Sequence, residues 1–190
     1  MEAGGTRAMS FRQTWWDLSA YVGVAAISLA ALPMPAAAFA TILGFSAILI
    51  ARIDLERFII PDVAVIVILL VGLTLAYFEA GTTGVVEAVL RAGAAGAAFC
   101  LLRFVYRWRS GVEGLGLGDV KLAVAAAPWL MASTLAFAFS VAAFAALLTV
   151  GVHALLVRER PRWRQEVPFG AFLAPAVWFA FLFERLWLLS

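Results

Sequence analysis

The sequence predicts an all-α membrane protein, a polytopic helical bundle with six or seven transmembrane helices. Hydrophobic residues make up 65% of the 190 residues and charged residues only 14%. The mean hydropathy is +1.00, whereas a typical soluble domain is roughly half apolar. Most arginines fall in short connections between long apolar runs, and this alternation is typical of chains that cross a membrane several times.

Seven apolar segments are candidate spans, because a helix needs roughly 20 apolar residues to cross a bilayer. Pro33 and Pro35 separate the first two, since proline breaks helices, and the turn at 81–84 separates the third and fourth. No such signal marks the boundary near 131–134, and the first and fifth segments are short, so the count is six or seven. The segments lie at about 17–32, 36–52, 61–78, 84–106, 118–131, 132–157 and 167–188.

The N-terminal residues admit two interpretations. Arg7 and Arg12 precede an apolar run from about Leu18 to Leu32, and small residues follow Pro35, as in a signal peptide. The alternative, which we adopt, is a retained first transmembrane helix. Residues 1–16 are then a cytoplasmic tail, and residues 17–190 form a single membrane-embedded domain. Both interpretations give the same topology for the later segments.

The basic residues predict the orientation of the chain. With the N-terminus in the cytoplasm, every Lys and Arg except Arg91 and Arg185 falls in a cytoplasmic connection. The opposite connections, near 33–36, 79–84 and 131–134, contain none, which is the positive-inside pattern. The same distribution argues against a nucleic-acid partner despite the net charge of +2. The run of arginines from 158 to 164 is interpreted as a topology anchor in contact with the lipid bilayer.

Small and aromatic residues are assigned packing and interfacial roles. The run from 92 to 98 contains only alanine and glycine, which favours internal helix packing over a dimer face or a substrate groove. The seven tryptophans mostly lie near segment ends, as in an interfacial aromatic belt.

Two aspartates lie at the cytoplasmic boundary of apolar segments. Asp54 follows the second segment, and Asp119 follows Gly116-Leu117-Gly118. Ionisable groups at such positions are costly and usually functional. Two nearby carboxyl groups can activate water and protonate a leaving group, so we predict that Asp54 and Asp119 form a catalytic pair. A helix cap is the alternative for Asp119, and a solvated acid paired with a neighbouring arginine is the alternative for Asp54.

Three further residues are predicted to support this pair. Gly116 and Gly118 permit close backbone approach. Lys121 either supports the site electrostatically or anchors the chain at the interface. Asp62 follows Pro61 at the start of a segment, where helix capping is the favoured role.

Metal chemistry has little basis in this sequence. Cys100 is the only cysteine and His153 the only histidine, whereas zinc sites need three or four such ligands. We predict neither a metal nor another cofactor, and we expect chelators not to inhibit.

Three motifs give the chain a family resemblance. Asp54-Leu55-Glu56-Arg57-Phe58-Ile59-Ile60-Pro61-Asp62, Gly116-Leu117-Gly118-Asp119-Val120-Lys121 and Val167-Pro168-Phe169-Gly170-Ala171-Phe172-Leu173 occur in this order. Together they resemble the type IV prepilin peptidases, a family of intramembrane aspartyl proteases. The resemblance covers roughly residues 36–180 and implies that Asp54 and Asp119 are the catalytic aspartates.

The resemblance also implies a biological role. It implies removal of the short basic leader of prepilins or pseudopilins, at the cytoplasmic face of the bacterial inner membrane, for a type IV pilus or a type II secretion system. Larger members carry a cytoplasmic domain with Cys-x-x-Cys motifs and also methylate the product, so we expect peptidase activity without methyl transfer here. The alternatives are a non-catalytic membrane component of such an assembly and a small transporter.

Overall fold

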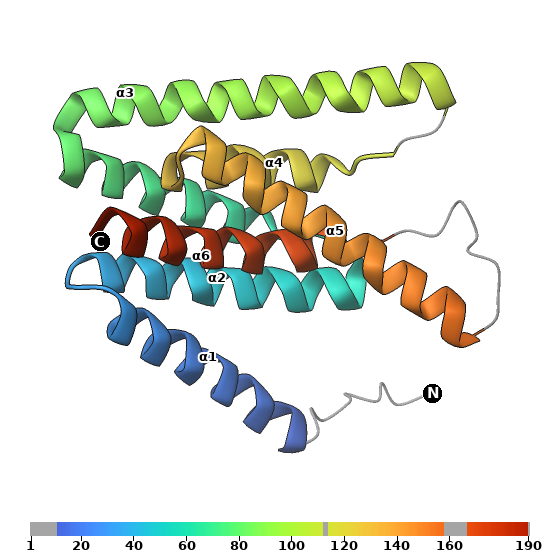
Figure 1. The fold of residues 1–190 in the computed structure, drawn as a ribbon, viewed down its shortest axis with the longest axis horizontal. Coiled ribbons are helices and arrows are strands. Elements are labelled where there is room, and N and C mark those ends of the chain that lie inside the picture. The colour runs from blue at the N-terminus through green and yellow to red at the C-terminus, as the bar shows by residue number, and fades with distance from the viewer. Residues whose placement is uncertain (1–10, 112–113, 158–166, 190) are drawn as a thin grey trace, which may run out of the picture.

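A computed structural model describes residues 11–111, 114–157 and 167–189 and shows no strand among them (Figure 1). The all-α prediction is therefore confirmed. The first ten residues of the predicted tail and the arginine run from 158 to 164 lie outside the described residues. The elements are α1 (Phe11–Ala31), α2 (Ala36–Arg57), α3 (Asp62–Ser110), α4 (Leu117–Ala126), the 3-10 helix η1 (Ala127–Trp129), α5 (Ala132–Val157) and α6 (Phe169–Leu189).

Four helices within the described residues are long and apolar enough to cross a membrane, namely α2, α3, α5 and α6. The 49-residue helix α3 is bent, because its backbone is not helical at Ala80 and Gly81. Gly81 has a φ of 62°, which glycine adopts without strain. The second arm, 82–110, runs back along the bundle (Figure 1). The break predicted near residue 81 is thus confirmed, because α3 consists of two helical arms that meet at this kink.

The first and fifth predicted segments contain only short apolar helical stretches. Only Leu18–Ala31 of α1 is an apolar helical stretch, shorter than a span. The fifth segment, 118–131, forms the ten-residue helix α4 followed by η1, and ten helical residues rise only about 15 Å. The boundary near 131–134 lies where expected, and Pro128 within η1 is the signal for it in the sequence.

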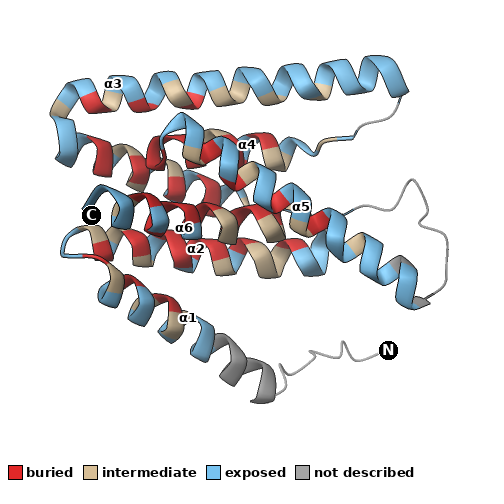
Figure 2. Ribbon diagram, viewed as in Figure 1, coloured by how far each residue is buried: buried red, intermediate tan, exposed pale blue. Residues whose placement is uncertain are grey.

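The core lies between α2 and α6, which run side by side with α1 on one flank and α3 and α4 on the other (Figure 1). Their facing sides carry the buried residues (Figure 2). Trp129 is among the largest fully buried side chains, and its Nε1 donates a hydrogen bond to the carbonyl of Ile68 at 2.9 Å. Because Trp129 is buried, the interfacial role predicted from its position near a segment end is wrong, and Trp178, in the middle of α6, is buried as well.

The small-residue run in α3 packs internally only in part. Ala92 is buried, and a Cβ added at Gly96 would lie 2.9 Å from Cγ2 of Val124 on α4. Gly93 and Ala94 are exposed. This contact lets the second arm of α3 approach α4 closely and so fixes the helix that carries Asp119.

Candidate active site

Asp54 lies in the last turn of α2 and is only 5% exposed. The helix ends at Arg57, and the C-cap residue Phe58 has a left-handed backbone (φ 55°) and donates its N–H to the carbonyl of Asp54 at 2.9 Å. The carboxylate is held from the opposite direction by the start of α6. The N–H of Ala171 donates to its Oδ2 at 2.9 Å, and the amide of Gly170 is a second backbone donor. A buried carboxylate needs such donors.

Asp119 lies in the first turn of α4, outside the four membrane-length helices, and is half-buried. Its carboxylate accepts a hydrogen bond from the N–H of Gly116, the N-cap residue of α4. Burial and, as the second cause, the negative charge of Asp54 raise the pKa of Asp119 to about 6, against the lowering effect of that hydrogen bond. Asp119 is therefore both a helix-terminal acceptor and an electrostatic partner of Asp54.

The glycines before Asp119 lie close to the rest of the site. A Cβ added at Gly116 would lie 3.1 Å from Oδ2 of Asp119, and one at Gly118 would lie 3.3 Å from the side chain of Ile60. Side chains at these positions would crowd the carboxyl group or the loop after α2. These distances leave little room for a side chain at either glycine, and the supporting role predicted for both stays a prediction.

Lys121 and Asp62 pair with each other. Nζ of Lys121 lies 2.8 Å from Oδ1 of Asp62, and both side chains are more than half exposed. The N-cap of α3 is Pro61, which makes no side-chain cap hydrogen bond, so ion pairing replaces the capping role predicted for Asp62. The pair joins the first turn of α3 to the N-terminal half of α4. The supporting role predicted for Lys121 stays a prediction, to which this ion pair gives a physical basis.

The sequence interpretation assigned no role to Gly170 or Ala171. A Cβ added at Gly170 would lie 3.0 Å from Oδ2 of Asp54 and 2.7 Å from Cδ1 of Ile60. Glycine therefore lets the start of α6 approach Asp54 closely enough for the Ala171 amide to reach it. The signal was present in the third motif, because Pro168-Phe169-Gly170 places a glycine in the first turn of a helix.

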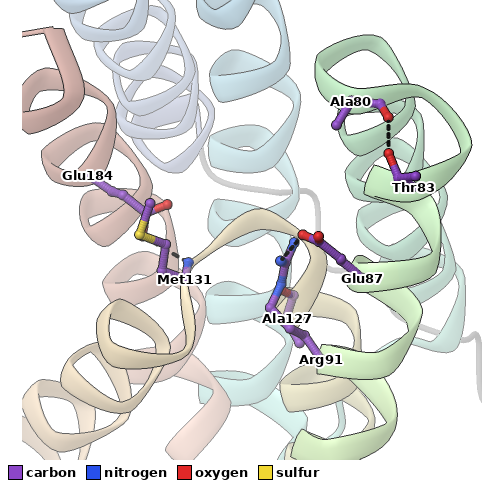
Figure 3. A network of polar contacts seen from close by, with 7 residues as sticks. All are labelled: Ala80, Thr83, Glu87, Arg91, Ala127, Met131 and Glu184. Carbon is purple, nitrogen blue, oxygen red and sulfur yellow. Dashed lines mark hydrogen bonds and ion pairs between the residues drawn. The ribbon is translucent and has the colours of Figure 1, made fainter.

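A second polar cluster lies near the C-terminal end of α6, whereas Asp54 lies near its start (Figure 3). It surrounds a cavity of about 170 Å³, which is lined by η1, by the end of α6 and by the residues at the bend of α3. Oε2 of Glu184 accepts the N–H of Met131 at 3.0 Å, and Nε of Arg91 donates to the carbonyl of Ala127 at 3.4 Å. Arg185 pairs with Glu79 at 2.5 Å. Arg91 and Arg185, the two arginines outside the positive-inside pattern, thus bind groups at the places where the chain turns: Arg91 the carbonyl of Ala127 in η1 and Arg185 the carboxylate of Glu79 beside the bend of α3.

The arrangement around Asp54 and Asp119 allows acid–base chemistry. Two carboxyl groups that repel each other's charge hold one proton between them, so one is a base and the other an acid at the same pH. No group of three or more potential metal ligands occurs among the described residues. The prediction that metal is not needed remains to be tested.

Fold and site together define a helical membrane protein with an acidic pair at one end of its bundle. The profile of the type IV leader peptidase family matches residues 40–151, more than half of the chain. The chain belongs to this family. The match includes both Asp54 and Asp119.

Individual relatives agree with this assignment. The prepilin leader peptidase/N-methyltransferase of Burkholderia pseudomallei is 33% identical over 80% of this chain and 49% of its own length. That of Aeromonas hydrophila is 29% identical over 75% of this chain and 48% of its own length. The leader peptidase HopD of Salmonella typhimurium is 42% identical over 41% of this chain and 50% of its own. The chain thus spans about half the length of these relatives. No solved structure matches it.

Proposed function

We propose that this chain is an intramembrane aspartyl endopeptidase that removes the short basic leader of prepilin-like proteins at the cytoplasmic membrane face. One observation carries the proposal. Asp54 is buried at the end of α2, and its charge helps to raise the pKa of Asp119 to about 6. A pair of carboxyl groups in this relationship is suited to hydrolysis by a proton-sharing mechanism.

In the proposed reaction, the ionised carboxylate takes a proton from a water molecule. The water oxygen forms a bond to the carbonyl carbon of the scissile peptide. The protonated carboxyl group gives its proton to the amide nitrogen, the carbon–nitrogen bond breaks, and the leader leaves with a new carboxyl terminus. Asp54 and Asp119 titrate as a coupled pair, so the proton belongs to both.

The proposal extends to position and partners. The chain crosses the bacterial inner membrane six or seven times, with its N-terminus and its acidic pair towards the cytoplasm, as the arginine distribution indicates. The substrate is a prepilin or pseudopilin whose basic leader stays at the interface while its apolar helix lies in the bilayer. Gly116, Gly118 and Lys121 support the pair by leaving it room and by holding α4 in place.

A cleavage assay with a co-expressed substrate tests the proposal. The substrate carries a basic leader, a glycine and an apolar helix, and mass spectrometry locates the cut. We expect Asp54→Asn and Asp119→Asn each to lower the cleavage rate at least about 100-fold, the lower range for a positioned acid or base. Mass spectrometry of the product also tests the expectation of cleavage without methylation.

Glu56→Gln is the matched control for these variants. It removes a carboxylate from the same end of the bundle, but Glu56 is exposed and lies outside the proposed machinery. Its cleavage rate should stay within about twofold of wild type. An intact substrate with the wild-type protein would overturn the proposal and favour a non-catalytic membrane component. Normal turnover by either asparagine variant would remove that aspartate from the pair.

A further inference from the structure

The side chain of Ile60 lies against two glycines of the site, Gly118 in α4 and Gly170 in α6. Its Cβ, Cγ1 and Cδ1 each lie 3.3 Å from the point where a Cβ of Gly118 would be. Its Cδ1 lies 2.7 Å, and its Cγ1 3.0 Å, from the corresponding point on Gly170. Oδ2 of Asp54 lies 3.0 Å from that same point on Gly170. The isoleucine side chain is therefore beside the carboxylate and contacts the starts of both α4 and α6.

We propose that Ile60 is a specificity-determining residue that admits only glycine immediately before the scissile bond. The inference rests on the proposed function, because it concerns the substrate of that same site. It gives the glycine of the proposed substrate a physical reason in one side chain of the enzyme.

The reaction geometry brings the substrate against Ile60. The attacked carbonyl carbon must lie within reach of a water held by Asp54, about 3 Å from the reacting atoms. The Cα before the scissile bond is only about 1.5 Å from that carbon. Because Gly118 and Gly170 contribute no side chain, Ile60 packs directly against both and lies beside the Asp54 carboxylate, where the substrate must approach. A glycine Cα can pass beside it, whereas a Cβ would meet the isoleucine methyl groups.

Ile60 has little freedom to yield. Its side chain is branched at Cβ, which restricts rotation about χ1, and it is half-buried between the two glycine segments. Pro61 follows it and caps α3. Two residues earlier, Phe58 ends α2 in the left-handed conformation. A substrate side chain at this position would therefore overpack the site instead of displacing the isoleucine.

The test compares two substrates that differ only before the cut, one with glycine and one with alanine, each with the full-length enzyme in membranes. The measurement is the ratio of the alanine to the glycine cleavage rate within each enzyme preparation. This ratio does not depend on how much enzyme is folded. Ile60→Ala should raise it at least about tenfold, the lower range for one methyl group in a tight pocket. Ile60→Val should raise it by a smaller factor.

Ile59→Ala is the matched control. Ile59 is 59% exposed, so the same truncation next door should leave the ratio unchanged. An unchanged ratio in both Ile60 variants, with the glycine substrate still cleaved by wild type, would show that Ile60 is only a packing residue. If Ile60→Ala cleaves neither substrate, the ratio in Ile60→Val decides. Failure of wild type to cleave the glycine substrate would instead overturn the proposed function.

Discussion

The carboxylate of Asp54 accepts a hydrogen bond from the backbone amide of Ala171 across 117 residues of chain, at 2.9 Å. The donor lies in the first turn of α6, where backbone N–H groups and the helix dipole favour a negative charge. Helix α6 therefore completes the environment of Asp54. This contact assigns a physical role to the Pro168-Phe169-Gly170 motif, which brings the start of α6 against α2.

We predict that Gly170→Ala lowers both activity and stability. The new Cβ would lie 2.7 Å from Cδ1 of Ile60 and 3.0 Å from Oδ2 of Asp54, closer than atoms pack without displacement. Overpacking of this kind costs about 1–3 kcal/mol and would push Ala171 away from Asp54. Thermal unfolding in detergent and the cleavage rate measure the two effects, and we expect the rate to fall at least about tenfold.

Gly151→Ala is the control for this change. Gly151 also lies in a helix, α5, but an added Cβ would meet nothing within 4 Å. Alanine should therefore leave activity unchanged and raise stability by roughly 0.5–1 kcal/mol. Equal behaviour of the two alanine variants would contradict the close approach of α6 to Asp54.

The rate of cleavage should fall as the pH rises through about 6. The pKa of Asp119 is raised to about 6 by burial and by the charge of Asp54. Below that pH the pair retains the proton that the mechanism gives to the leaving nitrogen. Above it the proton is lost, so kcat/KM should decrease about tenfold per pH unit. At much lower pH both carboxyl groups are protonated and the base is lost, which gives a bell-shaped profile.

Measurement of kcat/KM between pH 4 and 8 checks this prediction. The Glu56→Gln variant should reproduce the wild-type profile, because that exposed side chain lies outside the pair. Return of a sample from pH 8 to pH 5.5 should restore the rate, which separates titration from inactivation. A rate that is flat or rises between pH 6 and 8 would contradict a shared proton.

The sequence was sufficient for the all-α class, because this class depends on local signals, whereas the catalytic role of the two aspartates stays a prediction. Long apolar runs and short arginine-rich connections mark the helices. Asp54 and Asp119 are conspicuous because charge is scarce in such a chain. The contacts between residues far apart in the chain could not be predicted from the sequence. Lys121 reaches Asp62 across 59 residues, and no local pattern specifies a contact between two exposed side chains so far apart.

The burial of individual side chains was also not predictable from local sequence patterns. Trp129 lies near a segment end, as an interfacial residue would, yet it is 1% exposed. Its place in the core depends on Gly72, where an added Cβ would lie 2.5 Å from the indole Nε1. Such complementarity between a large residue and a distant glycine appears only when the helices are packed.

We predict that the pair of Lys121 and Asp62 positions α4 with only a small contribution to stability. Both side chains are more than half exposed, and exposed pairs contribute about 0.2–1 kcal/mol. Lys121→Met and Asp62→Asn should each lower cleavage by less than about tenfold. The exchanged double variant, Lys121→Asp with Asp62→Lys, should recover part of the rate. Failure of the exchange to recover any activity would indicate that Lys121 acts on the aspartates or the substrate directly.

The orientation of the chain can be tested by labelling single cysteines. Cys100 is exposed, so it is first replaced by serine. Cysteine is then introduced at Glu56, Thr82 or Ser133, which are all exposed. A membrane-impermeant maleimide added to spheroplasts should label Thr82→Cys but not Glu56→Cys, because Arg52 and Arg57 flank Glu56 and the connection near Thr82 has no basic residue.

Ser133→Cys decides whether the short segment from 118 to 131 carries the chain across. The neighbouring Met131 donates its N–H to Glu184, and the adjacent Arg185 pairs with Glu79 beside the bend of α3. These contacts put the start of α5 at the same end of the bundle as Thr82, so both cysteines should be labelled from outside. Labelling of Thr82→Cys only after the membrane is opened would refute the orientation. Labelling of Ser133→Cys on the side of Glu56→Cys would contradict a crossing by α4 and η1.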